Sequence, residues 1–220
     1  QWRARDAALP VYAPSERLDF ELEVGCYVGG GNVLGDPVLL RDAENHVFGL
    51  SLVNDWSARD IQAWEYQPLG PFLAKSFLTS VSPWIVTLEA LAPFRVPAHV
   101  RGTNAPPLLP HLDDAADRAA GGIDIALEAL LLTQKMRDAD RPAERVTATA
   151  FADQYWTVFQ MLAHHTSNGC NLSPGDLLAS GTVSGPAPHQ AGCLLEMTVG
   201  GERPLRLADG TERAFLEDGD

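Results

Sequence analysis

Short apolar runs divide the 220-residue chain into strand-like segments separated by turns. Runs of roughly four to eight apolar or alternating residues, bounded by Gly, Pro, Asn or Asp, are typical of strands. Such runs lie within residues 18–28, 47–53, 84–88, 123–133, 176–179 and 193–199, and turn-rich pieces such as GGGNVLGDP and LSPGD separate them. The pattern predicts a β-rich core.

Residues 151–169, FADQYWTVFQMLAHHTSNG, have a helical period instead. The apolar residues that recur at this spacing are Phe151, Tyr155, Val158, Phe159 and Leu162. Asn168 and Gly169 then favour a left-handed termination, so the segment predicts one main amphipathic helix. Residues 93–122 are rich in Pro, Ala and Asp without clear periodicity, and we expect a long surface excursion there.

Composition indicates a single globular domain over residues 1–220, because the chain is 45% hydrophobic and 20% charged and is long enough for one core. The net charge of −13 and the pI near 4.7 disfavour nucleic acid and anionic membranes as partners and favour a divalent cation. No apolar stretch approaches the roughly 20 residues of a membrane span. The start, QWRARDAALP, lacks the apolar region of a signal peptide.

The three cysteines, Cys26, Cys170 and Cys193, are widely spaced and contain no CxxC pair. Their odd number argues against a disulfide framework, and their spacing argues against a zinc knuckle. We therefore expect a reducing, cytoplasmic environment.

The stretch LDFELEVG places Glu21 and Glu23 one residue apart in an apolar run. Successive strand residues point to opposite faces, so both carboxylates share one face. Mutual repulsion favours protonation of one of them or a positive charge nearby. Two interpretations stay open: a strand with one wet face, or a metal site.

A second polar concentration lies in residues 47–77, VFGLSLVNDWSARDIQAWEYQPLGPFLAKSF. A buried strand is expected to end at Asp55, and a short helical piece follows with Arg59, Gln62 and Tyr66, before a Pro/Gly turn leads to Lys75. So many polar groups among Trp and Phe in a turn-rich segment favour a functional site.

Structural alternatives exist for these residues. Asp55 fits the N-cap of the helix that follows, Arg59 and Asp60 fit exposed helix charges, and Lys75 fits a solvated side chain.

Three motifs, LDFELE, NDWSARDIQAWEYQPLGPFLAKSF and NGCNLSPGDLLASGTVSGP, closely resemble the fumarylacetoacetate hydrolase family, in the same order and over nearly the whole chain. The resemblance implies an α+β, β-rich fold, a mixed β-sheet roll, in a homodimer. It also implies metal-dependent hydrolysis of a carbon–carbon bond in a small diketo acid, 4-fumarylacetoacetate, to fumarate and acetoacetate, the last step of tyrosine and phenylalanine catabolism.

The resemblance implies metal-binding roles as well. Glu21, Glu23 and Asp55 match carboxylate ligands of the family, and such hard oxygen ligands suit Ca²⁺ or Mg²⁺ better than zinc. Lys75 and Thr79 fall where the family has a second site, for Mg²⁺. Because a cationic Lys is a poor direct ligand, we interpret that match as proximity.

Catalytic roles follow from the same resemblance. Arg59, Gln62 and Lys75 match the donors that stabilise an oxyanion. The residues that match substrate contacts are Gln62, Tyr66 and Thr182. From the residues alone, Thr182 also fits a tight bend between glycines.

Glu196, in CLLEMTV, matches the carboxylate that orients the family's catalytic histidine, although it also fits an outward residue on a half-buried strand. That histidine and a fourth acidic ligand lie upstream of the paired glutamates in the family. No motif places any of the six histidines in this role; they are His46, His99, His111, His164, His165 and His189. We therefore expect a fragment that lacks the upstream segment and the final strands, and carries most of the metal site without the general base.

Three functions remain open at this point. The first is hydrolysis of 4-fumarylacetoacetate. The second keeps the fold and the metal but acts on acylpyruvates or oxaloacetate. The third is a non-catalytic fragment that binds metal or mediates dimerisation.

Overall fold

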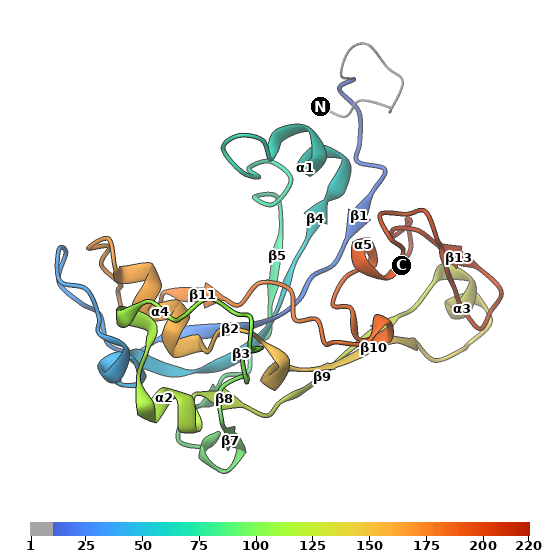
Figure 1. Cartoon of the computed structure of the whole chain (residues 1–220). Coiled ribbons are helices and arrows are strands. Elements are labelled where there is room, and N and C mark those ends of the chain that lie inside the picture. The colour runs from blue at the N-terminus through green and yellow to red at the C-terminus, as the bar shows by residue number, and fades with distance from the viewer. Residues whose placement is uncertain (1–10) are drawn as a thin grey trace.

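A computed structural model of the protein describes residues 11–220. Its central antiparallel sheet has the order β11-β2-β3-β5, and β6 also pairs with β3. The strands are β2 (Leu22–Val28), β3 (Val47–Asp55), β5 (Thr79–Val81), β6 (Val86–Thr87) and β11 (Leu177–Ala179). β2 and β3 form its longest ladder, from Leu22 opposite Asn54 to Val28 opposite Val47 (Figure 1).

Smaller antiparallel pairs surround this sheet. They are β1 (Leu18–Asp19) with β4 (Ser57–Ala58), β7 (Arg95–Val96) with β8 (Gly122–Ile123), β9 (Ala126–Leu131) with β10 (Glu144–Ala150), and β12 (Leu205–Arg206) with β13 (Glu212–Arg213). The α-helices are α1 (Arg59–Glu65), α2 (Ala115–Ala120), α3 (Gln134–Asp138), α4 (Val158–Thr166) and α5 (Leu194–Met197). Short 3₁₀ helices are η1 (Leu40–His46), η2 (Ala92–Phe94), η3 (Pro110–Leu112), η4 (Phe151–Asp153) and η5 (Pro188–Gln190).

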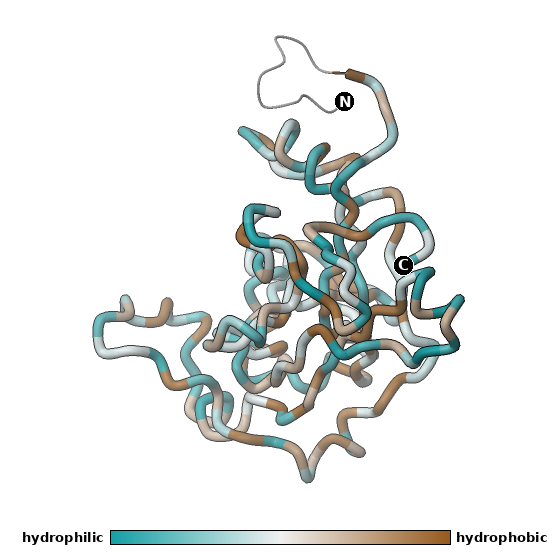
Figure 2. The backbone as a smooth tube through the Cα atoms, turned by 90° about the vertical axis from the view of Figure 1, so that its right-hand side faces the viewer, coloured by the Kyte–Doolittle hydropathy of each residue, from teal (hydrophilic) through white to brown (hydrophobic). Residues whose placement is uncertain are grey.

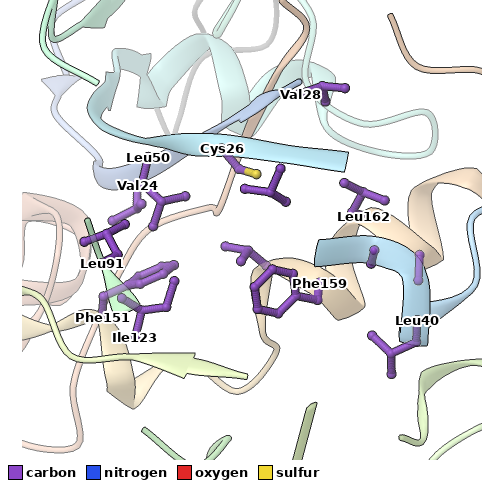
Figure 3. Packing of buried hydrophobic residues seen from close by; sticks show 14 of the residues in the cluster. Val24, Cys26, Val28, Leu40, Leu50, Leu91, Ile123, Phe151, Phe159 and Leu162 are labelled. Carbon is purple, nitrogen blue, oxygen red and sulfur yellow. The ribbon is translucent and has the colours of Figure 1, made fainter. Parts of the chain in front are cut away.

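The main core lies between one face of β2–β3 and α4. Cys26 and Leu50 face each other across the ladder, and Phe159 and Leu162 of α4 belong to the same buried cluster (Figure 3). Burying a side chain such as Leu162 contributes roughly 1.5–3 kcal/mol, so α4 is held mainly by its apolar face. A smaller cluster of Leu131, Met136 and Leu207 lies at the far end of the β9–β10 ribbon.

The segment that contains α1 stands apart from this body. Figure 1 shows α1 above the sheet, joined to it through β4 and β5, and in Figure 2 the same part of the chain lies toward the top of the molecule. The β-rich α+β roll with α4 as its main helix is confirmed. Within residues 11–220, no helix is both long and apolar enough to cross a membrane.

Two expected elements are divided. The run at 18–28 forms β1 and β2 with a break between them, and the expected helix at 151–169 forms η4 and then α4. The start of α4 has a local cause: the Thr157 hydroxyl accepts from the Gln160 N–H, and the Gln160 side chain accepts from the Thr157 N–H. This capping box begins the helix at Val158.

The strand expected at 193–199 is wrong, because residues 194–197 form α5. The cause is remote in sequence: the carboxylate of Asp19 accepts hydrogen bonds from the N–H groups of Leu194 and Leu195. Val199 and Gly200 then have positive φ angles of 53° and 71° and end the helix.

The surface excursion expected at 93–122 is only partly correct, since β7, η3 and α2 lie there and Leu112 belongs to the main core. The expected run at 84–88 shortens to β6, and the run at 123–133 contains the end of β8 and β9. The strands that were not expected are β4, β5, β7, β10, β12 and β13.

Candidate metal centre

Glu21, Glu23 and Asp55 converge at the end of the β2–β3 ladder. One carboxylate oxygen from each lies within 4.8 Å of the others. Antiparallel pairing causes this, because it places Leu22 opposite Asn54 and lets the Asp55 N–H donate to the Glu21 carbonyl at 3.3 Å. The expected convergence of the three acids is confirmed.

The wet-face interpretation of the paired glutamates is wrong. Glu21 is 9% exposed and Glu23 is 2% exposed. Burial and the charge of Glu21 raise the pKa of Glu23 to about 8. Burial also opposes ionisation of Glu21, but Lys75 and then Arg59 outweigh it and lower the pKa of Glu21.

Arg59 is buried at the start of α1 and is not an exposed helix charge. Its Nη1 donates to Glu21 Oε1 at 2.8 Å and to Gln62 Oε1 at 3.0 Å. Its Nε donates to Asp19 Oδ2 at 2.8 Å. The N-cap position of α1 belongs to Ala58, so Asp55 is not the helix cap.

Lys75 is a second cationic partner of Glu21. Its Nζ donates to Glu21 Oε2 at 2.6 Å, to Asp55 Oδ2 at 3.1 Å and to Ser57 Oγ at 2.7 Å. Lys75 is therefore not merely solvated, and each oxygen of Glu21 accepts a hydrogen bond from a different cation.

Other expected site residues are Thr79, Tyr66 and Thr182. Thr79 is exposed on β5, directly opposite Asp55 in the ladder. Tyr66 follows α1 and is 50% exposed. Thr182 is half-buried in a segment that is joined to β2 by a 2.8 Å hydrogen bond from the Val183 N–H to the Leu22 carbonyl.

Glu196 is exposed on α5 and accepts a hydrogen bond from the Ser184 hydroxyl. The Ser184 oxygen in turn accepts from the Gly192 N–H at 2.9 Å. The contacts described for Glu196 thus join it to the segment before α5 and not to the acidic cluster.

The histidines have other surroundings in the described part of the chain. His46 Nδ1 lies 2.7 Å from the Gly30 carbonyl, His99 packs near Tyr155, His111 stacks on His164, His165 Nε2 lies 3.6 Å from Cys170 Sγ, and His189 is in η5.

A sequence model of the family described as "Fumarylacetoacetate (FAA) hydrolase C-terminal" matches residues 3–220. The chain belongs to this family. It is 54% identical to the fumarylacetoacetase of Arabidopsis thaliana over 211 residues, which are 96% of this chain and 48% of that protein. It is 47% identical to the human fumarylacetoacetase over 220 residues, which are 100% of this chain and 50% of that protein. The chain spans about half the length of these relatives.

Solved structures share the fold of this fumarylacetoacetate hydrolase family member. Cg1458, crystallised with an inhibitor, matches with a TM-score of 0.53 and 18% identity over 81% of this chain and 49% of that chain. A protein from Mycobacterium smegmatis that carries the name HpcE matches with a TM-score of 0.51 and 22% identity over 84% of this chain and 51% of that chain. The resemblance carried by the three sequence motifs is confirmed by the family match.

The donor set of this fumarylacetoacetate hydrolase family member fits a hard divalent cation. Glu21, Glu23 and Asp55 offer carboxylate oxygens, the ligands that Ca²⁺ and Mg²⁺ prefer. With Asp19 included, four carboxylates face two cationic side chains. Full ionisation therefore leaves two excess negative charges, which one divalent cation balances.

Sequence reasoning missed two residues that support the site. Asp19 is fully buried and binds Arg59, and it shares the i, i+2 alternation with Glu21 and Glu23, a signal that was present in LDFELE. Glu65 ends α1 and accepts from the N–H groups of residues 72, 73 and 74 at 2.6, 3.1 and 2.8 Å. This single carboxylate fixes the turn that leads to Lys75.

Proposed function

We propose that this chain supplies the metal-binding part of an enzyme that hydrolyses the carbon–carbon bond of 4-fumarylacetoacetate, giving fumarate and acetoacetate in tyrosine and phenylalanine catabolism. The observation that carries the proposal is the convergence of Glu21, Glu23 and Asp55 with Arg59 and Lys75 against them. The relatives named fumarylacetoacetase, which match nearly all of this chain, support the choice of substrate.

Glu21, Glu23 and Asp55 would hold Ca²⁺ or Mg²⁺. The bound cation supplies Lewis-acid chemistry, which polarises a diketone carbonyl. Glu21 can ligate without losing its partners, because each carboxylate oxygen has two lone pairs and the structure uses one on each. Lys75 then contacts the site through Glu21 and Asp55 and is not itself a ligand. Thr79, opposite Asp55, is the better candidate for a ligand of a second Mg²⁺.

Arg59, Gln62 and Lys75 are the proposed donors to the oxyanion that forms when water attacks, and Lys75 would exchange one of its three present acceptors for it. The Gln62 carbonyl already accepts from Arg59, so its amide NH₂ remains as the donor. One well-placed donor contributes roughly 3–4 kcal/mol to the transition state. Tyr66 and Thr182 are proposed to contact the substrate.

The water must lose a proton to a general base, and a histidine suits this role near neutral pH. We propose that this histidine belongs to the part of the relatives' length that the chain does not span, with Glu196 as the carboxylate that orients it. The surroundings of the six histidines in this chain support that assignment.

The test compares cleavage of 4-fumarylacetoacetate, followed by loss of diketone absorbance, in this chain and in a polypeptide extended upstream to the relatives' length. At equal Mg²⁺ or Ca²⁺ concentration, we expect the extended protein to be at least roughly 10²-fold faster, the usual contribution of a general base. Release of pyruvate or CO₂ in place of acetoacetate would identify the alternative substrates. Cation binding without turnover in the extended protein would leave only the non-catalytic role, and equal turnover by both would place the base within this chain.

We also propose a cytoplasmic homodimer. Three free cysteines, Cys26, Cys170 and Cys193, support a reducing compartment. Exposed Phe48, Leu52 and Val86, on adjacent strands of the central sheet, support association. Sedimentation of the extended protein as a monomer at micromolar concentration would contradict the dimer.

A further inference from the structure

Asp19 is a fully buried carboxylate with donors from two distant parts of the chain. Its Oδ2 accepts from Arg59 Nε at 2.8 Å and from the Leu195 N–H at 2.9 Å, and its Oδ1 accepts from the Leu194 N–H at 2.8 Å. In β1 it also pairs with Ser57, whose hydroxyl accepts from Lys75.

We infer that Asp19 is a positioning residue that holds Arg59 and helix α5, which carries Glu196, in one fixed relation to the acidic cluster. The inference rests on the proposed function for the roles of Arg59 and Glu196. The link itself is seen directly: Glu196 immediately follows Leu195, whose N–H binds Asp19. No motif match assigns a role to this residue.

The geometry explains why a carboxylate is needed. A neutral acceptor could satisfy the N–H groups of Leu194 and Leu195, but a guanidinium buried beside them needs a negative partner. Arg59 then points its Nε at Asp19 and its Nη1 at Glu21. If Asp19 were neutral, Glu21 would be the remaining carboxylate partner of Arg59 in the described structure, and a cation at Glu21 would face a guanidinium charge that Asp19 no longer offsets.

Asp60 offers a matched control. It is 3% exposed, directly follows Arg59, and accepts from Ser15 Oγ, Glu16 N–H and Ile61 N–H at 2.7, 2.8 and 2.9 Å. Among the described residues, it pairs with no cationic side chain. Asp60→Asn therefore removes the same charge from an equally buried site without touching the link between Arg59 and α5.

The experiment compares Asp19→Asn and Asp60→Asn in the 220-residue chain. Amide hydrogen exchange reports the link, and calorimetric titration with Mg²⁺ and Ca²⁺ reports the site. We expect Asp19→Asn to speed exchange at Leu194 and Leu195 by about tenfold or more and to weaken cation binding by about tenfold, which corresponds to about 1.4 kcal/mol. Asp60→Asn should leave both values within about threefold of the unsubstituted chain, which is less than about 0.7 kcal/mol.

Turnover in the extended protein gives a further test of positioning. Asp19→Asn should lower kcat and leave KM nearly unchanged, because the donors act on the transition state. Arg59→Lys should cost much less in the Asp19→Asn background than alone, because residues that act as one unit are not additive.

Some outcomes would overturn the inference. These are unchanged exchange at Leu194 and Leu195 in Asp19→Asn, equal loss of cation affinity in Asp60→Asn, or full additivity with Arg59→Lys. If Asp19→Asn does not fold, the Arg59→Lys chain tests the link by itself. The link requires faster amide hydrogen exchange at Leu194 when Asp19 loses its guanidinium partner. Failure of the unsubstituted chain to bind Mg²⁺ or Ca²⁺ defeats the proposed function, while hydrogen exchange still decides the link.

Discussion

Asp55→Asn separates the binding role of the acidic cluster from its structural role. Without a cation, Asp55 contributes a 3.1 Å ion pair with Lys75, in which the side chains are 28% and 19% exposed. Such partly exposed pairs contribute about 0–1 kcal/mol. Asp55 also repels Glu23, whose pKa it helps to raise. The two effects oppose each other, so we expect the free energy of unfolding without cation to change by less than about 1 kcal/mol.

Cation binding should respond far more strongly. Asp55 supplies one of the three converging carboxylates, and Asn keeps the shape but loses the charge. Even partners outside the coordination shell cost roughly 10- to 100-fold in metal affinity when they are removed, so loss of a ligand carboxylate should cost at least roughly 100-fold. The substitution therefore affects binding by about 2.7 kcal/mol or more and folding by much less.

The assay is calorimetric titration with Mg²⁺ and Ca²⁺, together with thermal melts in EDTA and in excess cation. The unsubstituted chain should gain thermal stability with cation, because a ligand that binds only the folded state stabilises it, and Asp55→Asn should lose that gain. Asp42→Asn is the control, since Asp42 also pairs with a cation, Arg41, at 3.6 Å. Unchanged cation affinity in Asp55→Asn would refute the metal centre, and a loss above about 3 kcal/mol in EDTA would show that Asp55 is mainly structural.

Three further predictions concern the supports of the fold. Glu65→Gln should leave global stability within about 1 kcal/mol but speed hydrogen exchange at Ala74 by about tenfold, because one oxygen of Glu65 accepts from both residues 72 and 74; unchanged exchange would contradict this. Burial raises the pKa of Asp117 above its ordinary 3.8, so its contribution to stability is present at lower pH and is lost as pH rises through the raised value. In urea unfolding between pH 3 and 7, the free energy of unfolding of Asp117→Asn should therefore rise relative to that of the unsubstituted chain as the pH rises. A difference between the two that does not change with pH would disprove the assignment. Leu162→Ala should cost about 2–5 kcal/mol in the same assay, since Leu162 is fully buried in the main core; a cost below about 1 kcal/mol would mean that α4 is not held by its apolar face.

Local pattern was sufficient where the cause of a structure lies in neighbouring residues. Alternation in LDFELEVG correctly put Glu21 and Glu23 on one face, and the apolar period predicted α4. The capping box of Thr157 and Gln160 is also visible in the sequence, and it predicts a helix that starts at Val158.

Pattern failed where the cause is distant in sequence. The run at 193–199 alternates like a strand, but Asp19, 175 positions away from Leu194, supplies the acceptors that begin α5. In the same way, no local period predicts that Lys75 lies beside Glu21, which is 54 positions away. The position of Lys75 depends on the turn before it, and the Glu65 carboxylate holds that turn. The motif resemblance placed Lys75 near the paired glutamates, since it encodes tertiary contacts that periodicity does not contain, but it gave no role to Asp19.

The same contacts explain how four acids can fold together before any cation binds. Arg59 and Lys75 keep Glu21 ionised, as its lowered pKa indicates, while burial and the charge of Glu21 raise the pKa of Glu23 to about 8. A proton held on Glu23 lowers the excess from two negative charges to one, so the site can fold without an ion. A divalent cation would exchange with that proton rather than complete an unfolded site, which is why Asp55→Asn should reduce binding without unfolding the chain.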